Sequence, residues 1–292
     1  MRLSTLGLVL ALLVPAHARA DDTGEIIVKL QELPANDELK QFPKFAISGN
    51  LIHVGWTTGN VSDLLPGTPG DGKAKLEKVI VAKSGDSKVA WIAADVRGVR
   101  ASDACAPGPC APITQPPMHA TALLERVGSE WRWVAWHITE PTTFKEQRQA
   151  HAEGTVPDVL ARSVTKADDV VAVFQTSILD PSALAASVSD RKDVVLYGSA
   201  ANERYVGGAK VKKQLAAWKL AFTIRDGIQA GVAGDGKIAW VAANVDAVPL
   251  KNPLVKPMPY RVLAIYELNG AKWRLVQAHF SVDVWTWTGK TK

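Results

Sequence analysis

Cysteine is almost absent from this chain, and the two that occur lie close together in one proline-rich stretch, at Cys105 and Cys110. Two cysteines cannot complete a structural zinc site, and no histidine stands near them in the sequence. We therefore expect a short-loop disulfide and no metal. Glycine-rich phosphate loops, HExxH metal motifs and GxSxG nucleophile elbows are also missing, so nothing indicates a nucleotide, flavin or haem cofactor.

The chain also lacks a long uncharged apolar run after its first twenty residues. Residues 1–20 have the pattern of a secretory signal peptide: Arg2 gives a positive start, residues 6–13 are apolar, and Ala18-Arg19-Ala20 forms a small-x-small cleavage site. That apolar run is too short to span a bilayer. We predict an exported protein, periplasmic or extracellular, without a membrane span.

A basic stripe with interleaved aromatic residues is missing as well, although the formal net charge is +5. Such a stripe is the usual electrostatic footprint of a nucleic-acid-binding protein. We therefore expect no nucleic-acid partner.

What the chain does contain is an internal repeat. GDSKVAWIAADV (residues 85–96) recurs as GDGKIAWVAANV (residues 234–245), with eight of twelve positions identical. WRWVAWHIT (residues 131–139) then recurs as WRLVQAHFS (residues 273–281). Two ordered matches over comparable spans indicate one domain present twice. We predict domains at 21–141 and 156–292, joined by a polar connector at 142–155.

The second copy shows the order of elements more completely. Helices are predicted near 170–178 and 182–188, followed by a strand at 193–197. A third helix is expected to open at Gly207, with an apolar stripe of Val211, Leu215, Trp218 and Phe222. Strands joined by Asp-Gly and Asn-Gly turns follow, from residue 228 to residue 282. Helices first and hairpin-linked strands afterwards predict an α+β fold.

Copy two resembles a SnoaL-like domain of the nuclear transport factor two and ketosteroid isomerase superfamily. The likeness rests on LYGS (residues 196–199), the Gly207-Gly208 helix start, IAWVAANV and the final WRLVQAHFS run. Copy one is similar through VAWIAADV and ALLERVGSEWRWV (residues 122–134). The resemblance implies two cone-shaped curved antiparallel sheets, each wrapping N-terminal helices around a pocket, and pairing back to back.

The last strand of each copy has an outer face that is too apolar for solvent. Strict alternation puts the following residues on that face: Trp131, Trp133 and His137 in copy one, and Trp273, Leu275, Gln277 and His279 in copy two. We predict that the two outer faces pack together as a pseudo-dimer within one monomeric chain. The two histidines would then be hydrogen-bonded interface groups, the alternative being a ligand or proton-transfer role.

A ligand pocket is expected at the open end of each cone. Its candidate residues are Tyr197, Glu203, Tyr205, Trp218, Trp240 and Asn244 in copy two, and His53, Trp91 and Asp95 in copy one, with His53 taken as the counterpart of Tyr197. Tryptophans at such positions are more often core, and Glu203 is more often a solvated loop carboxylate. Asp95 has no tyrosine partner within its own copy.

These residues leave the function open between classes. The first hypothesis is an exported, non-catalytic protein that binds a small apolar ligand or an envelope protein partner. The alternative is a cofactor-independent isomerase, cyclase or dehydratase that uses general acid–base chemistry in the second pocket. A third is a purely structural module. Tyr197 and Glu203 converging on one cavity would favour the enzyme.

Overall fold

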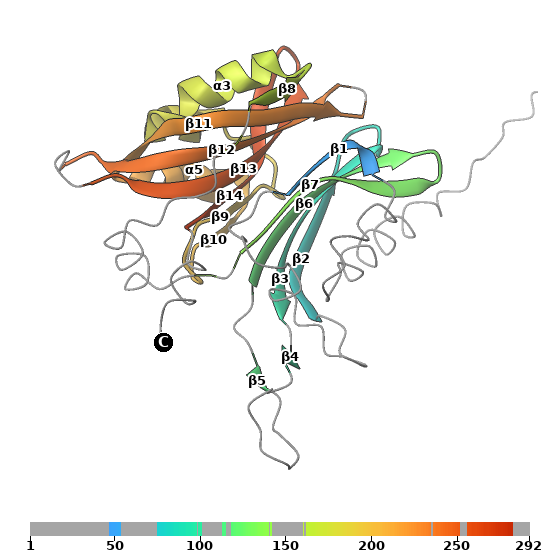
Figure 1. Cartoon of the computed structure of the whole chain (residues 1–292), viewed down its shortest axis with the longest axis horizontal. Helices are drawn as coiled ribbons and strands as arrows, with labels where there is room; N and C mark the ends of the chain where they lie inside the picture. Colours follow the sequence, from blue (N-terminus) through green and yellow to red (C-terminus); the bar gives the residue numbers. More distant parts are fainter. Residues whose placement is uncertain are drawn as a thin grey trace, which may run out of the picture.

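The computed structural model describes residues 47–53, 75–97, 99–100, 113–114, 118–139, 141, 160, 162–234, 236–251 and 256–282. The predicted signal peptide, the predicted connector and both cysteines lie outside these residues. The described part forms two large sheets with helices on one of them, and this confirms the predicted α+β class (Figure 1).

The first sheet is drawn from the first copy and has the order β1-β7-β6-β3-β2. Its strands are β1 (Ile47–His53), β2 (Lys75–Lys83), β3 (Val89–Arg97), β6 (Met118–Val127) and β7 (Glu130–Thr139). Strands β2, β3, β6 and β7 pair antiparallel, and β1 joins β7 in parallel. A separate small pair joins β4 (Val99–Arg100) to β5 (Ile113–Thr114).

The second sheet is larger and has the order β10-β9-β14-β13-β12-β11-β8. Its strands are β8 (Ser163–Thr165), β9 (Val195–Tyr197), β10 (Arg204–Val206), β11 (Leu220–Ala233), β12 (Ile238–Pro249), β13 (Met258–Asn269) and β14 (Lys272–Ser281). The long strands β11 to β14 form an antiparallel meander, and the short strands β8 and β9 join its two sides in parallel.

Three helices cover one face of the second sheet: α3 (Asp168–Ile178), α4 (Pro181–Ser187) and α5 (Gly208–Ala217). Helix α4 begins where Asp180 accepts a hydrogen bond from the Ser182 amide and Pro181 takes the first helical position, a sequence suited to a helix start. The helices and the sheet enclose an apolar core that includes Phe174 and Leu215.

The third helix is shorter than its apolar stripe predicts. Helix α5 ends at Ala217, and Trp218 is already extended. Phe222 lies in β11, which begins at Leu220 and pairs with β12 over most of its length. The backbone ladder with β12 overrides a helical periodicity that continues into the strand. Trp218 and Phe222 still pack against the helix-side core, so their apolar character was a sound indication of burial.

The face of the second sheet away from the helices packs against the first sheet (Figure 1). One buried cluster contains Trp91 and Leu123 from the first sheet together with Trp240 and Ile265 from the second. This arrangement confirms the predicted intrachain pseudo-dimer. Strand β12 is consequently buried on both faces: Trp240 lies toward the first sheet, and its neighbour Val241 lies toward the helices. Two-sided burial explains why the repeated motif is an almost continuous apolar run.

A β-bulge changes which residues of β14 reach this interface. Ile265 pairs with Gln277, whereas the next residue, Tyr266, pairs with Leu275, so Val276 is the extra residue. Strict alternation therefore fails at this point. The predicted interface positions Leu275 and Trp273 are wrong, because both pack with the helix-side core.

The first sheet has an equivalent bulge at Val134. Leu123 pairs with Ala135, while Leu124 pairs with Trp133. Leu123 and Ala135 belong to the inter-sheet cluster. The bulge therefore turns Trp133, and with it Trp131, to the opposite face, and their predicted place at the interface is wrong. Both tryptophans are nonetheless buried.

The sheet register also corrects the placement of His53. His53 pairs with Trp136, as Leu196 pairs with Ala278 in the second sheet. His53 therefore occupies the position of Leu196, and its predicted equivalence to Tyr197 is wrong by one residue.

The β11–β12 turn meets the first sheet closely at Gly234. This residue has a φ of +64°, and a Cβ atom there would lie 2.6 Å from Cγ2 of Val89. We predict that Gly234→Ala lowers the free energy of unfolding by about 2 to 4 kcal/mol, from backbone strain and inter-sheet overlap together. Urea denaturation measures the loss.

Gly270→Ala is the matched control, since Gly270 has a similar φ of +61° and open space where its Cβ would be. It should show the backbone penalty alone, about 1 to 2 kcal/mol. Equal losses in the two variants would contradict a close contact between Gly234 and the first sheet.

Candidate functional site

A pair of buried histidines lies where the two sheets meet. The rings of His137 and His279 stack with centroids 4.0 Å apart, and neither residue is exposed. His137 Nε2 lies 2.8 Å from Ser281 Oγ, and His279 Nε2 lies 2.8 Å from Thr139 Oγ1. Ser281 and Thr139 stand two residues after the histidine of their own copy, so the two contacts are reciprocal and follow the repeat. The arrangement has the form of an interface between two related halves.

Further hydrogen bonds cross the interface beside this pair. Thr121 Oγ1 lies 3.1 Å from Nδ1 of His279, and Gln277 donates from Nε2 to the carbonyl of Ile92 at 2.7 Å. Burial holds the pKa of His279 well below its usual range, with the nearby His119 adding to the decrease. A neutral ring held between two hydroxyl groups serves as an interface hydrogen-bonding group.

A second polar cluster at the interface contains Asp95 and Tyr197. The Tyr197 hydroxyl donates to Asp95 Oδ1 at 3.0 Å, and Lys78 Nζ lies 2.8 Å from Asp95 Oδ2. Arg204 donates from Nε to the Tyr197 hydroxyl at 3.1 Å and from Nη2 to the carbonyl of Lys78 at 2.7 Å. Asp95 thus obtains its tyrosine partner from the other copy.

His119 completes this cluster. Its ring stacks on that of Tyr197 with centroids 4.3 Å apart, and it is 2% exposed. Burial lowers the pKa of His119 to about 4, against an opposing effect of the Asp95 carboxylate. Burial likewise raises the pKa of Tyr197, with Asp95 adding to the increase. At neutral pH His119 is therefore uncharged and Tyr197 is a hydrogen-bond donor to a carboxylate.

The polar groups of this cluster find their hydrogen-bond partners within the interface. Both oxygens of Asp95 are occupied, and Asp95 and Tyr197 are almost fully buried. A general acid or base must come within hydrogen-bond reach of the substrate atom that it serves. Asp95 and Tyr197 instead hold the two sheets together.

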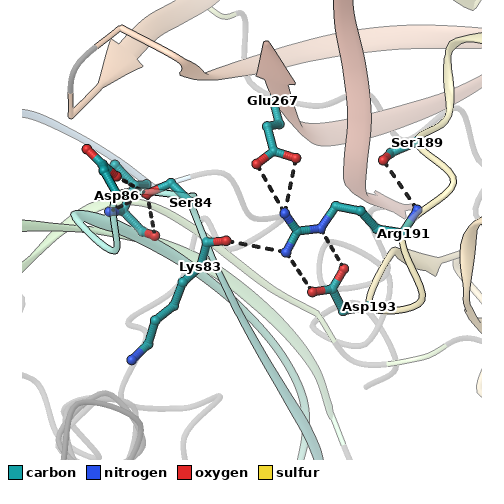
Figure 2. Close-up of polar contacts among 8 residues, drawn as sticks. Lys83, Ser84, Asp86, Ser189, Arg191, Asp193 and Glu267 are labelled. Atoms are coloured by element: carbon teal, nitrogen blue, oxygen red, sulfur yellow. Dashed lines mark hydrogen bonds and ion pairs between the residues drawn. The ribbon is translucent and has the colours of Figure 1, made fainter. Parts of the chain in front are cut away.

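Two polar contacts join the outer ends of the interface, and they occupy equivalent places in the two copies. On one side Glu125 accepts a hydrogen bond of 2.9 Å from the Gly234 amide. On the other side Glu267, the counterpart of Glu125, pairs with Arg191 at 3.1 Å, and Arg191 donates to the carbonyl of Lys83 at 3.3 Å (Figure 2). Glu125 thus contacts the β11–β12 turn of the other copy directly. Glu267 reaches the end of β2 in the other copy through Arg191.

Arg191 is held firmly in this second contact. It donates from Nε and Nη2 to Asp193 at 2.8 and 2.7 Å, as Figure 2 shows. Its guanidinium carbon also lies 4.9 Å from the ring centroid of Trp91. Paired and stacked guanidinium groups are well suited to linking separate segments.

Aromatic side chains fill the interior between the helices and the second sheet. Trp218 makes edge contacts with Phe222 and Phe280 at centroid separations of 5.6 and 5.2 Å, and Phe222 contacts Tyr260 in the same way at 5.9 Å. Edge-to-face packing of this kind stabilises a core. The predicted pocket residue Trp218 is therefore part of the interior packing.

The residues predicted to line a pocket do not come together in one. Trp91, Trp240, Asp95 and Tyr197 lie between the two sheets. Asn244 is fully buried and binds its own unit: its amide donates to Asp226 at 2.8 Å and its oxygen accepts from Arg261 at 2.9 Å. The predicted pocket is wrong for these five residues, because the sheet face that carries them packs against the other sheet.

Glu203 lies just before β10 and Tyr205 lies within it. Both residues have local partners. Glu203 accepts a hydrogen bond of 3.0 Å from the Ala200 amide and so closes its own turn. Tyr205 packs against the helix-side core, with Lys210 Nζ 6.0 Å from its ring centroid. Tyr197 and Glu203 bind different partners, Asp95 and the Ala200 amide, and no contact joins them.

An open groove lies elsewhere, along α3 and α4. It has a volume of about 1010 Å³ and runs between these helices and the β13–β14 turn. Its floor consists of small and apolar side chains: Ala172, Val173, Ala183, Val232, Leu268 and Trp273. A second hollow of about 380 Å³ continues from it past Thr176 and shares Ala172, Val173 and Ala183. This continuous surface is the candidate functional site.

The sequence reasoning missed the groove and several interface residues. His119, Lys78 and Arg204 lie outside the repeated stretches, so the repeat gave no sign of them. Their importance comes from contacts between the two copies. Thr139 and Ser281 could have been found, since each lies two positions after a repeated histidine and so on the same strand face.

Two structural features are absent from the described part of the chain. No group of three or more histidine, cysteine, aspartate or glutamate side chains there is placed to hold a metal ion. None of its helices has the length and apolar character needed to cross a membrane.

No protein family model matches the chain, and no curated protein is similar to it. Solved structures that are similar include NTF2-like proteins. One, from Salmonella enterica serovar Typhimurium, is 14% identical, with a TM-score of 0.35 over 44% of this chain and 97% of that one. Another, from Shewanella oneidensis, is 19% identical, with a TM-score of 0.30 over 39% of this chain and 97% of that one.

A third, from Pseudomonas putida, is 13% identical, with a TM-score of 0.31 over 39% of this chain and 82% of that one. These neighbours belong to the superfamily that the sequence resembles. Each covers less than half of this chain.

Acid should weaken the interface through its histidines. Because the folded pKa of His119 is about 4 and that of a free histidine about 6.5, unfolding takes up a proton between these values. The contribution of His119 to the free energy of unfolding is fully present above pH 6.5, and it falls by roughly 3 kcal/mol as the pH drops toward 4. The groups that face His119 are Asp95, Arg204 and Lys78, together with the neighbouring His279.

Urea denaturation between pH 7 and 4 measures this loss. His119→Phe keeps a ring against Tyr197 and removes the proton site, so its stability should fall less steeply over the same range. Identical slopes for the variant and the natural protein would contradict the role given to His119.

The Asp95 cluster makes a separate prediction. Asp95→Asn keeps the shape of the side chain and removes the charge that faces Lys78 and Arg204, so we expect a loss of about 1 to 3 kcal/mol in unfolding free energy. Asp246→Asn is the control, since Asp246 pairs with Arg225 in a more solvent-accessible position. That change should cost less than about 1 kcal/mol. A loss no larger for Asp95→Asn than for the control would show that the cluster does not hold the interface.

Proposed function

We propose that this is an exported, non-catalytic binding protein that holds an apolar small molecule in the groove along α3 and α4. The observation that carries the proposal is the groove itself: about 1010 Å³ of open space over an apolar floor that includes Val173 and Trp273. Small-molecule sites are typically concave and mostly apolar, with volumes of roughly 300 to 1000 Å³.

Three features favour binding over catalysis. The carboxylate and tyrosine that could have formed an acid–base pair, Asp95 and Tyr197, are buried between the sheets with partners of their own. Glu203 is engaged in its own turn. The interior around Trp218 is packed with aromatic rings. The isomerase, cyclase or dehydratase alternative therefore loses the two groups on which it was based, Tyr197 and Glu203.

The groove can be tested by filling it. Ala172 is exposed on α3 and lines both parts of the groove. Nile red, an uncharged apolar dye, should bind the full chain saturably, with a rise in its fluorescence. Ala172→Trp should weaken this binding by about tenfold or more, because the indole occupies the floor.

Ala216→Trp is the matched control, because Ala216 is an exposed alanine on α5, away from the residues that line the groove. It should leave the affinity for Nile red unchanged. Absence of saturable dye binding, or equal affinity in the two variants, would contradict the groove as the binding site.

A further inference from the structure

Cationic groups line the larger part of the groove, and none lines the second hollow. Lys272 and Arg274 come from the start of β14, whereas Lys166 lies two residues before α3, beside β8 and on the far side of β13, β12 and β11. All three line the larger part of the groove. Asp169 is the one carboxylate among the lining residues. The larger part of the groove therefore carries a net positive charge.

The second hollow carries no charge. From Lys166 the groove follows α3 past Ala172 and Val173 to Thr176 in the second hollow. At a rise of 1.5 Å per residue, the eight steps from Asp168, the first residue of α3, to Thr176 correspond to about 12 Å along the helix. No charged side chain lines the second hollow, whose walls are Ala172, Val173, Thr176, Ser177 and Ala183. The groove is thus positively charged in its larger part and uncharged in the second hollow.

Arg274 is fixed in position in the charged part. It donates from Nη1 to the carbonyl of Ala186 on α4 at 2.9 Å, which holds its guanidinium beside the groove. Lys272 is exposed and has its ammonium free to move toward a ligand. One fixed and one mobile cation next to an apolar channel suit an anionic group better than an uncharged one.

We infer that the groove binds an amphipathic molecule with a single unbranched apolar chain and one anionic head group, such as a fatty acid. The head group lies at Lys272 and Arg274, and the chain lies over Ala172, Val173 and Ala183. This inference rests on the proposed function and adds to it the chemical class of the ligand and its direction in the groove.

The test compares three chains of equal length that differ only in head group: dodecanoate, dodecanol and dodecyltrimethylammonium. Isothermal titration calorimetry with the full chain, below the aggregation threshold of each compound, gives the affinities. Dodecanoate should bind about tenfold more tightly than dodecanol, and the cationic compound more weakly than either. Raising the salt concentration should reduce the preference for dodecanoate and leave dodecanol binding almost unchanged.

Lys272→Glu should abolish the preference of dodecanoate over dodecanol without loss of dodecanol binding. The matched control is Lys213→Glu, an exposed lysine on α5 outside the groove; it should retain the tenfold preference. Thermal denaturation of each variant shows whether it is folded, and dodecanol binding reports an intact groove independently of charge.

The outcomes separate the two proposals. Equal affinity for all three compounds, with binding still lost in Ala172→Trp, would overturn the anionic ligand and leave the groove as a binding site. A preference for dodecanoate that persists in Lys272→Glu would also overturn the assigned head-group position. Failure of all three compounds and of Nile red to bind would overturn the proposed function itself.

Discussion

The structure depends on the mutual burial of two sheet faces. The first sheet carries Trp91 on one face, and the second carries its counterpart Trp240. If either face were open to solvent, a large apolar surface would be exposed to water. Packing the faces against each other buries both tryptophans in one cluster. It also makes β12 a strand with apolar contacts on both sides, which is why VAWIAADV and IAWVAANV are the most similar parts of the two copies.

Burying two sheets against each other requires partners for the polar groups on their surfaces. Near the centre of the interface the arrangement is symmetric: His137 and His279 stack, and each lies within hydrogen-bond distance of a hydroxyl group of the other copy. Away from the centre the copies differ. Asp95 binds across the interface to Tyr197, whereas its counterpart Asn244 binds Asp226 and Arg261 of its own sheet. The residues most suggestive of catalysis are thus interface groups, and the groove that we propose as the ligand site lies elsewhere, along α3 and α4.

The repeat, the α+β class and the first two helices could be predicted because local patterns determine them. The back-to-back sheets were expected from the family resemblance and from an apolar outer face, but the four apolar residues placed on that face, Trp131, Trp133, Trp273 and Leu275, do not lie at the interface. The failures came from features that local patterns do not carry. One extra residue at Val276 and one at Val134 reversed the faces of Leu275 and Trp133, and a bulge leaves no clear mark in a strand sequence. The pocket residues were misplaced because a buried tryptophan on a strand can face helices or another sheet equally well. The groove depends on how α4 and the β13–β14 turn approach α3, and no single segment contains that information.

Hydrogen exchange tests most directly whether the shared sheet face makes the two copies one cooperative structure. Trp91→Ala removes a large side chain from the first sheet's contribution to the common cluster. Our account predicts that backbone amides of β12 and β13 in the second sheet then exchange faster, together with those of β3 and β6, as measured by mass spectrometry of the full chain. Faster exchange confined to the first sheet, with the second sheet unchanged, would show that the two sheets are stable independently and would contradict the account.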